Sequence, residues 1–314
     1  MQRRKISLIG SGNIGGSIAY LAHLQHAFDI VLYDINGSMA RGRALDIAQA
    51  GAISGSDSCI IGTDDMQLTA NSDVVIVTAG KPRMPGMSRD DLLSINSKII
   101  QSLALQVKET SPNAFVIVVT NPLDVMVEVF RRTSGFASSK VVGMAGVLDA
   151  ARMNHFIAEE LNIADEKVHT QVLGGHGDLM VPLLTHSSVS GISLEEIVKQ
   201  GLITNEKLQD IFQRTRFGGG EIVKLLGNGS AFYAPATAVL KMTVAYLSNS
   251  KDLLPCAAYL QGEYGHKNIY IGVPVVIGSN GVEKILELTL SADEQNQFDQ
   301  SVKSVKSMLE AIND

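Results

Sequence analysis

The first half of the chain alternates short apolar runs with longer segments whose apolar residues recur on one helical face. Four runs are almost continuously apolar and rich in β-branched residues, as is typical of strands covered on both sides: Lys5–Gly10, Asp29–Asp34, Asp73–Ala79 and Phe115–Thr120. Helical spacing is found at Ile14, Ile18, Leu21 and Ala22, and in Leu92–Val107. Strands and helices that alternate in this way require right-handed crossovers between parallel strands. The pattern therefore predicts an α/β fold with a doubly wound parallel sheet of the Rossmann type.

The pattern changes near Val147, after which strand-like and helical segments no longer alternate regularly. We expect strands at Val168–Leu173 and Ile269–Ile277, and helices near Leu194–Gln200, Asn205–Leu226 and Ala234–Leu247. A last helix is expected to begin at Ser291, because Glu294 completes a capping box before an apolar stripe. We predict two closely packed domains, a Rossmann domain over residues 1–145 and an α+β domain over residues 146–314.

Composition narrows the classes of function. The chain has 26 basic and 32 acidic residues, a net charge of −6, which argues against a nucleic-acid binder with its basic stripe. Its two cysteines, Cys59 and Cys256, lie far apart and form no disulfide framework, which favours a reducing compartment. Since no apolar stretch is long enough for a membrane span, we expect a cytoplasmic protein with no membrane partner.

The segment Gly10-Ser11-Gly12-Asn13-Ile14-Gly15 has the form G-x-G-x-x-G, between the first strand and a helix. Gly10 permits the tight turn, Gly12 lets the backbone approach a pyrophosphate, and Gly15 allows close helix–strand packing. The helix N-terminus offers amide groups to the phosphates. Asp34 ends the second strand about 20 residues later, where an acid binds ribose hydroxyls and repels a 2′-phosphate. The motif together with Asp34 predicts binding of NAD rather than NADP. The alternative is that the glycines form a plain turn and that Asp34 only binds water at the end of its strand.

Three further segments carry polar residues that could take part in chemistry. The loop at residues 80–89 holds two prolines, two glycines, Arg83 and Arg89, and such a loop can be ordered yet move as a lid. Asn121 follows a strand, where its amide could meet a substrate. Asp149 and Arg152 are three residues apart on one helix face. The alternatives are solvated surface arginines and a surface salt bridge.

His176 lies among glycines in Gly174-Gly175-His176-Gly177-Asp178, at the end of a predicted strand. Imidazole has a pKa of about 6.5 and can exchange a proton near neutrality. A buried carboxylate at its other nitrogen would fix the tautomer. The alternative is a turn histidine bound to backbone.

Two other features are expected to have no catalytic role. His23 and His26 are three residues apart, but a solvated helix end is favoured over a metal site, and no clustered Cys/His pattern predicts a metal. The glycine run at residues 218–220 lacks the following G-K-[ST] of a phosphate-binding loop, so it indicates a backbone break or close packing.

Taken together and in order, these segments resemble the lactate/malate dehydrogenase family. The motifs are GSGNIG, KPRMPGMSR, TNPLD, LDAARM, GGHGD and SAFYAPA, which span residues 10 to about 236. The loop from residue 81 is similar to the malate-type version, particularly in bacterial enzymes most like lactate dehydrogenases. The resemblance implies reversible hydride transfer between NAD and (S)-malate, giving oxaloacetate and NADH, in the tricarboxylic acid cycle.

The resemblance also implies roles for individual residues. His176 would be the catalytic acid/base, Asp149 would orient it, and Arg89 would polarise the substrate carbonyl. Arg83, Arg89, Asn121 and Arg152 would bind substrate, with Arg83 pairing with its distal carboxylate. Ala231 would leave room for the larger substrate. The expected cofactor contacts are Gly10, Gly12, Asn13, Ile14, Gly15, Asp34, Asn96 and Asn121.

Two other functions compete with this one. A lactate or branched 2-hydroxy acid dehydrogenase would share the scaffold, and Arg83 argues against it. A nucleotide-sensing protein would need NAD but neither His176 nor two loop arginines. The family forms dimers and tetramers, and the likeness to lactate-type enzymes favours a tetramer.

Overall fold

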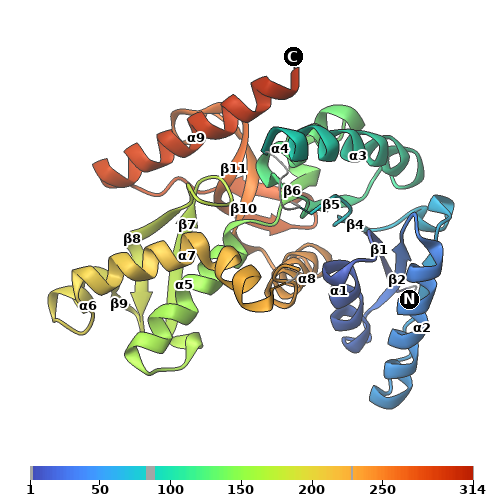
Figure 1. Ribbon diagram of the computed structural model, residues 1–314, viewed down its shortest axis with the longest axis horizontal. Helices are drawn as coiled ribbons and strands as arrows, with labels where there is room; N and C mark the ends of the chain where they lie inside the picture. Colours follow the sequence, from blue (N-terminus) through green and yellow to red (C-terminus); the bar gives the residue numbers. More distant parts are fainter. Residues whose placement is uncertain (1–2, 83–88, 228, 314) are drawn as a thin grey trace.

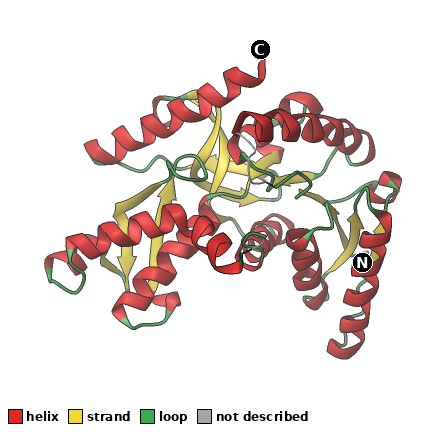
Figure 2. Cartoon of the chain, in the orientation of Figure 1, coloured by secondary structure: helices red, strands yellow, loops and turns green. Residues whose placement is uncertain are grey.

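A computed structural model describes residues 3–82, 89–227 and 229–313. Within them, the main sheet has nine strands in the order β12-β11-β10-β6-β5-β4-β1-β2-β3 (Figures 1 and 2). Its parallel part consists of β1 (Arg4–Ile9), β2 (Phe28–Tyr33), β3 (Ile60–Thr63), β4 (Val74–Val77), β5 (Phe115–Val118) and β6 (Val141–Gly143). The order 3-2-1-4-5-6 confirms the predicted Rossmann sheet.

Helices cover both faces of this sheet. On one face α1 (Asn13–Leu24) packs against α2 (Gly37–Ser54) and α8 (Tyr233–Ser248). On the other, α3 (Arg89–Thr110) packs against α4 (Leu123–Ser134), and both contact α9 (Ala292–Asn313). Figure 1 shows α3, α4 and α9 above the sheet and α1 and α8 below it. The predicted helices at residues 92–107 and 234–247 correspond to α3 and α8.

The second half extends the main sheet, which the apolar pattern did not predict. The antiparallel strands β10 (Asp252–Gln261), β11 (Lys267–Gly278) and β12 (Gly281–Ile285) join it where Ala257 pairs with Gly143. A separate antiparallel sheet contains β7 (Val168–Leu173), β8 (Val181–Val189) and β9 (Ile192–Ser193). It packs against α5 (Gly146–Leu161), α6 (Leu194–Lys199) and α7 (Asn205–Leu226). Short 3₁₀ helices lie at Met66–Thr69, Ser138–Lys140, Asp165–Lys167 and Glu263–Gly265.

One hydrophobic core runs through both halves of the chain. Its larger cluster contains Ile76 from β4, Ile271 from β11 and Phe298 from α9, all fully buried. A smaller cluster around Met153 and Leu208 lies between the small sheet, α5 and α7. Tight packing of the two halves is therefore confirmed. No helix among the described residues is long and apolar enough to cross a membrane.

The predicted capping box of the last helix is present. The backbone N–H of Ser291 donates to Glu294 Oε2 at 2.9 Å, and the N–H of Glu294 donates to Ser291 Oγ at 3.3 Å. Glu294 also accepts a hydrogen bond from the Thr185 hydroxyl of β8, 3.0 Å from Oε1. The box thus starts α9 and ties it to the small sheet.

Candidate active site

The glycine motif lies at the carboxyl end of β1, where the strand order reverses toward β4. Gly10 has φ +112°, and a Cβ there would lie 2.7 Å from the backbone nitrogen of Ala79. A Cβ at Gly15 would overlap the carbonyl oxygen of Gly10. By contrast, nothing lies within 4 Å of a Cβ placed at Gly12, at the N-terminus of α1. The loop therefore packs tightly inward and is open outward, as close approach of a pyrophosphate requires.

Asp34 is held against this loop. Its Oδ2 accepts hydrogen bonds from the Ser11 backbone N–H at 2.7 Å and the Ser11 hydroxyl at 3.0 Å, while Oδ1 accepts from the Asn36 N–H at 2.9 Å. The carboxylate is therefore fixed beside the turn rather than only solvated. Its contact with a ribose stays a prediction.

Asn96 joins the loops that follow β4 and β5. Its side chain accepts from the Lys81 N–H at 2.8 Å and donates to the Asn121 carbonyl at 2.7 Å, and it is 1 % exposed. Since the amide is engaged with backbone, the geometry makes Asn96 a support of the cofactor crevice. Asn121 is itself exposed at the mouth of the site. Asn13 accepts from Arg43 Nη2 of α2 at 3.1 Å.

His176 and Asp149 form a buried pair. The Nδ1–H of His176 lies 2.9 Å from Asp149 Oδ2, and Asp149 is 1 % exposed. Burial lowers the pKa of His176, but the charge and hydrogen bond of Asp149 outweigh it, so the net shift is upward. Because Nδ1 is engaged, Nε2 is the nitrogen left to exchange a proton. The alternative of a turn histidine bound only to backbone is wrong.

Arg152 joins the same pair from the next turn of α5. Its Nη1 lies 3.4 Å from Asp149 Oδ1, and its side chain is 13 % exposed, so the alternative of a surface salt bridge is wrong. The glycine run of α7 lies over it: a Cβ at Gly218 would be 3.2 Å from Arg152 Cδ. Since α7 is continuous through the run, close packing is confirmed and a backbone break is not.

A cavity of about 330 Å³ brings these groups together. Its lining includes Ile14, Asn121, Arg152, His176 and Ala231, from the glycine motif and from four distant segments. Arg83 lies outside the described residues. Arg89 begins α3, and its side chain also lies outside what the structure describes. The cavity can therefore hold a small anion beside His176, within reach of an arginine.

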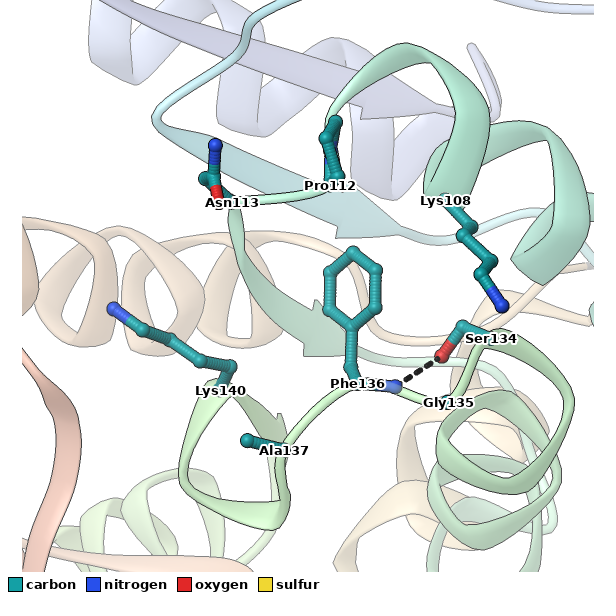
Figure 3. A pocket seen from close by; sticks show the side chains of 8 residues that line it. All are labelled: Lys108, Pro112, Asn113, Ser134, Gly135, Phe136, Ala137 and Lys140. Atoms are coloured by element: carbon teal, nitrogen blue, oxygen red, sulfur yellow. Dashed lines mark hydrogen bonds between the residues drawn. The ribbon is translucent and has the colours of Figure 1, made fainter.

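A larger hollow of about 410 Å³ lies at the opposite, amino ends of β5 and β6 (Figure 3). Lys108 and Lys140 lie on either side of Phe136, and Lys140 donates to the Tyr246 hydroxyl at 3.2 Å. Its lining contains no acid–base pair such as His176 and Asp149. The smaller cavity is therefore the candidate active site.

Two residues of the site had no predicted role. Asp124, within TNPLD, accepts a hydrogen bond from the His176 N–H at 2.9 Å. Arg216 lines the cavity, and its Nε donates to the Met180 carbonyl at 3.1 Å. The available signals were an acid that follows Asn121 in the same strand–helix turn and an arginine beside a glycine run.

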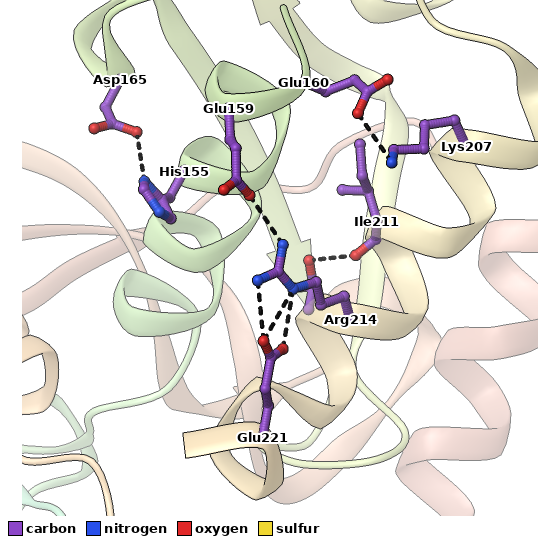
Figure 4. Close-up of polar contacts among 9 residues, drawn as sticks. His155, Glu159, Glu160, Asp165, Lys207, Ile211, Arg214 and Glu221 are labelled. Atoms are coloured by element: carbon purple, nitrogen blue, oxygen red, sulfur yellow. Dashed lines mark hydrogen bonds and ion pairs between the residues drawn. The ribbon is translucent and has the colours of Figure 1, made fainter. Parts of the chain in front are cut away.

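Salt bridges hold α5 and α7 together on their outer side. Arg214 of α7 donates to Glu159 of α5 and Glu221 of α7 (Figure 4). Its guanidinium carbon lies 4.1 Å from the Phe156 ring centroid. Lys207 pairs with Glu160 at 3.0 Å. These groups are exposed, so each pair contributes at most about 1 kcal/mol. They help to keep the glycine run over Arg152.

His23 is not at a solvated helix end as expected. It is 2 % exposed, and its Nδ1 lies 2.8 Å from the Ser58 hydroxyl. His26 is exposed. In the part of the chain that the structure describes, no three His, Cys, Asp or Glu side chains gather as a metal site.

Comparisons with known proteins agree with this geometry. The NAD binding domain of lactate/malate dehydrogenase matches residues 4–143, and the alpha/beta C-terminal domain of lactate/malate dehydrogenase matches residues 146–314. The chain is 46 % identical to malate dehydrogenase of Cryptosporidium parvum, with a TM-score of 0.97 and 99 % of each chain covered.

Two further solved structures are similar over nearly their whole length. Lactate dehydrogenase of Cryptosporidium parvum, complexed with lactic acid and NAD, is 46 % identical, with a TM-score of 0.97 and coverage of 100 % of this chain and 99 % of that one. Malate dehydrogenase of Plasmodium falciparum is 40 % identical, with a TM-score of 0.95 and coverage of 98 % of both chains. Enzymes of both specificities thus share this fold.

Proposed function

The chain belongs to the lactate/malate dehydrogenase family of NAD-binding oxidoreductases, and on that premise we propose that it is an NAD-dependent malate dehydrogenase. The observation that carries the proposal is the buried His176–Asp149–Arg152 cluster at the 330 Å³ cavity. In this cluster His176 can accept a proton, and Arg152 beside it can bind the carboxylate of a substrate. Bound NAD would accept the C2 hydride, and the open Gly12 turn beside Asp34 fits that cofactor.

The acid–base step follows from the orientation of the imidazole. Asp149 accepts from Nδ1, so neutral His176 can take the hydroxyl proton of malate at Nε2. The resulting imidazolium is stabilised by the Asp149 carboxylate. Arg152 would hold the C1 carboxylate through its planar fork. Arg89 would polarise the carbonyl oxygen, and Asn121 would donate to it.

Selectivity for malate rests on Arg83 and Ala231. Arg83 would pair with the distal carboxylate of malate or oxaloacetate, and Ala231, which lines the cavity, leaves space for that group. The similar solved structures include both malate and lactate dehydrogenases, so likeness alone does not choose between the substrates.

The direct test compares NADH oxidation by purified protein with oxaloacetate and with pyruvate at neutral pH. A preference for oxaloacetate of about a hundredfold, near 3 kcal/mol, supports the proposal. A preference for pyruvate would agree with dehydrogenase activity but contradict the proposal that malate is the substrate. NADH binding without turnover of either acid would favour the nucleotide-sensing alternative.

Arg83→Gln is expected to remove mainly the activity with oxaloacetate. Loss of one partner of a desolvated charge pair costs roughly 2–5 kcal/mol, or about 30-fold to several thousand-fold in kcat/KM. Activity with pyruvate, which has no distal carboxylate, should change far less. Lys81→Gln, from the same loop, is the charge-matched control. Equal losses on both substrates would show that Arg83 orders the loop instead of pairing with substrate.

The rate of malate oxidation is expected to fall as pH decreases through the pKa of His176, because only neutral imidazole accepts the proton. That pKa is raised, since Asp149 outweighs the opposing effect of burial. The fall should therefore occur at a higher pH than for an unperturbed histidine, while oxaloacetate reduction is favoured on the acid side. The measurement is kcat against pH, with a deuterium isotope effect showing that hydride transfer limits the rate. A flat profile between about pH 5 and 8 would contradict the role of His176.

We also propose a cytoplasmic homo-oligomer, a tetramer rather than a dimer, of the bacterial type most like lactate dehydrogenases, with a place in the tricarboxylic acid cycle. Light scattering after size exclusion would measure its mass against the 33.6 kDa chain.

A further inference from the structure

Three successive backbone amides of the loop that carries His176 are anchored by three different elements. The Gly174 N–H donates to the Gly272 carbonyl of β11 at 2.9 Å. The Gly175 N–H donates to the Ser301 hydroxyl of α9 at 2.8 Å, and the His176 N–H donates to Asp124 Oδ2 of α4 at 2.9 Å. Of these three acceptors, Asp124 alone can carry a charge.

Asp124 lies in an environment that opposes ionisation. It is 4 % exposed in the first turn of α4, and its Oδ1 has no hydrogen-bond partner among the described residues. Burial raises the pKa of Asp124 to about 6, against the opposing effect of the His176 N–H. A neutral side chain could accept the same hydrogen bond without burying a carboxylate, as Ser301 does for the preceding amide of Gly175. The anchor alone therefore does not explain an acid at this position.

The charges around the imidazole of His176 explain better why an acid is found at position 124. Asp149 and Asp124 both raise the pKa of His176, while Arg152 lowers it. In return, His176 lowers the pKa of Asp124 and Asp149 raises it. Two carboxylates and one guanidinium thus act electrostatically on one imidazole. The cluster is balanced when His176 is protonated, the form needed for reduction of a 2-oxo acid.

We propose that Asp124 is a positioning residue for the acid–base step, which holds the His176 backbone and favours the protonated imidazole through its charge. The inference rests on the role of His176 in the proposed function. It does not depend on which 2-hydroxy acid is the substrate. Asp124 acts through His176 and is not itself expected to touch substrate.

The decisive variant is Asp124→Asn, which keeps an oxygen acceptor for the His176 N–H and removes the charge. Ser301→Ala is the matched control, because it removes a neutral bond to the adjacent amide. The pKa of His176 is measured by NMR titration of its Cε1–H, assigned by the loss of that signal in His176→Asn. The titration requires no turnover. Thermal unfolding verifies that each variant is folded.

Asp124→Asn is expected to lower the pKa of His176. At a pH above this pKa, the protonated fraction of His176 should then fall by about tenfold for each unit by which the pKa is lowered. kcat for 2-oxo acid reduction should fall in parallel at neutral pH, with KM for NADH unchanged. Ser301→Ala should leave the pKa in place. Equal shifts in both variants, or an unchanged pKa in Asp124→Asn, would overturn the proposal. A wild-type protein inactive with every 2-oxo acid would instead contradict the proposed function, which separates the two failures.

Discussion

Replacement of His176 by asparagine is expected to lower kcat in both directions by about 10²–10⁴-fold, the usual contribution of general acid–base catalysis. Asparagine is polar and of similar size, but it cannot take up a proton at the position of Nε2. Asp149 would also lose the partner that lies 2.9 Å from its Oδ2. The measurement is steady-state turnover of oxaloacetate and malate, together with NADH binding by fluorescence.

NADH binding should stay close to wild type in His176→Asn, because the glycine motif and Asp34 lie at another part of the crevice. His155→Asn is the control: this histidine is exposed on α5 and pairs with Asp165 at 3.1 Å (Figure 4). A His176→Asn enzyme that kept more than about a tenth of its activity would exclude His176 as the acid–base group.

Arg152→Gln is expected to lower kcat/KM by about 30-fold to several thousand-fold, equivalent to roughly 2–5 kcal/mol. The substrate carboxylate would lose its cation, and the buried Asp149 would lose the guanidinium 3.4 Å from its Oδ1. Arg152→Lys should recover little, because an ammonium cannot form the bidentate fork. The loss should appear chiefly in the KM of the acid, with NADH binding unchanged.

Arg214→Gln provides the control for Arg152. It removes an exposed guanidinium from α7 that also contacts α5, so any loss through looser helix packing would appear in both variants. A reduction in kcat/KM of similar size in Arg214→Gln and Arg152→Gln would show that Arg152 acts through structure and not by binding the carboxylate.

The sequence predicted the first half better than the second for a physical reason. Strands buried on both faces, such as β1 and β5, are nearly continuous apolar runs. The strand β10 was missed because it contains Pro255 and small alanines, which have low strand propensity. The helix α4 was missed because Val125, Val127 and Val129 alternate as in a strand, and the segment is buried almost all round.

Local chemistry could be predicted where a short segment carries it alone. The glycine motif and Asp34 lie within 25 consecutive residues, and their roles depend on one turn and one strand end. The capping box of α9 is equally local, since Ser291 and Glu294 bond each other directly. Such features survive in any fold that keeps the segment, so the sequence by itself determined the dinucleotide-binding half.

The catalytic environment was decided by the tertiary structure. His176, Asp149 and Asp124 lie on three separate segments. The pKa values of His176 and Asp124 depend on burial and on neighbouring charges that no spacing along the chain encodes. Likewise, the need for glycine in α7 becomes clear only because Arg152 packs against Gly218. Residue types and their order determined the fold class and the family. The balance of buried charges that would set the proton affinity of His176 arises only when α4, α5 and the loop after β7 meet.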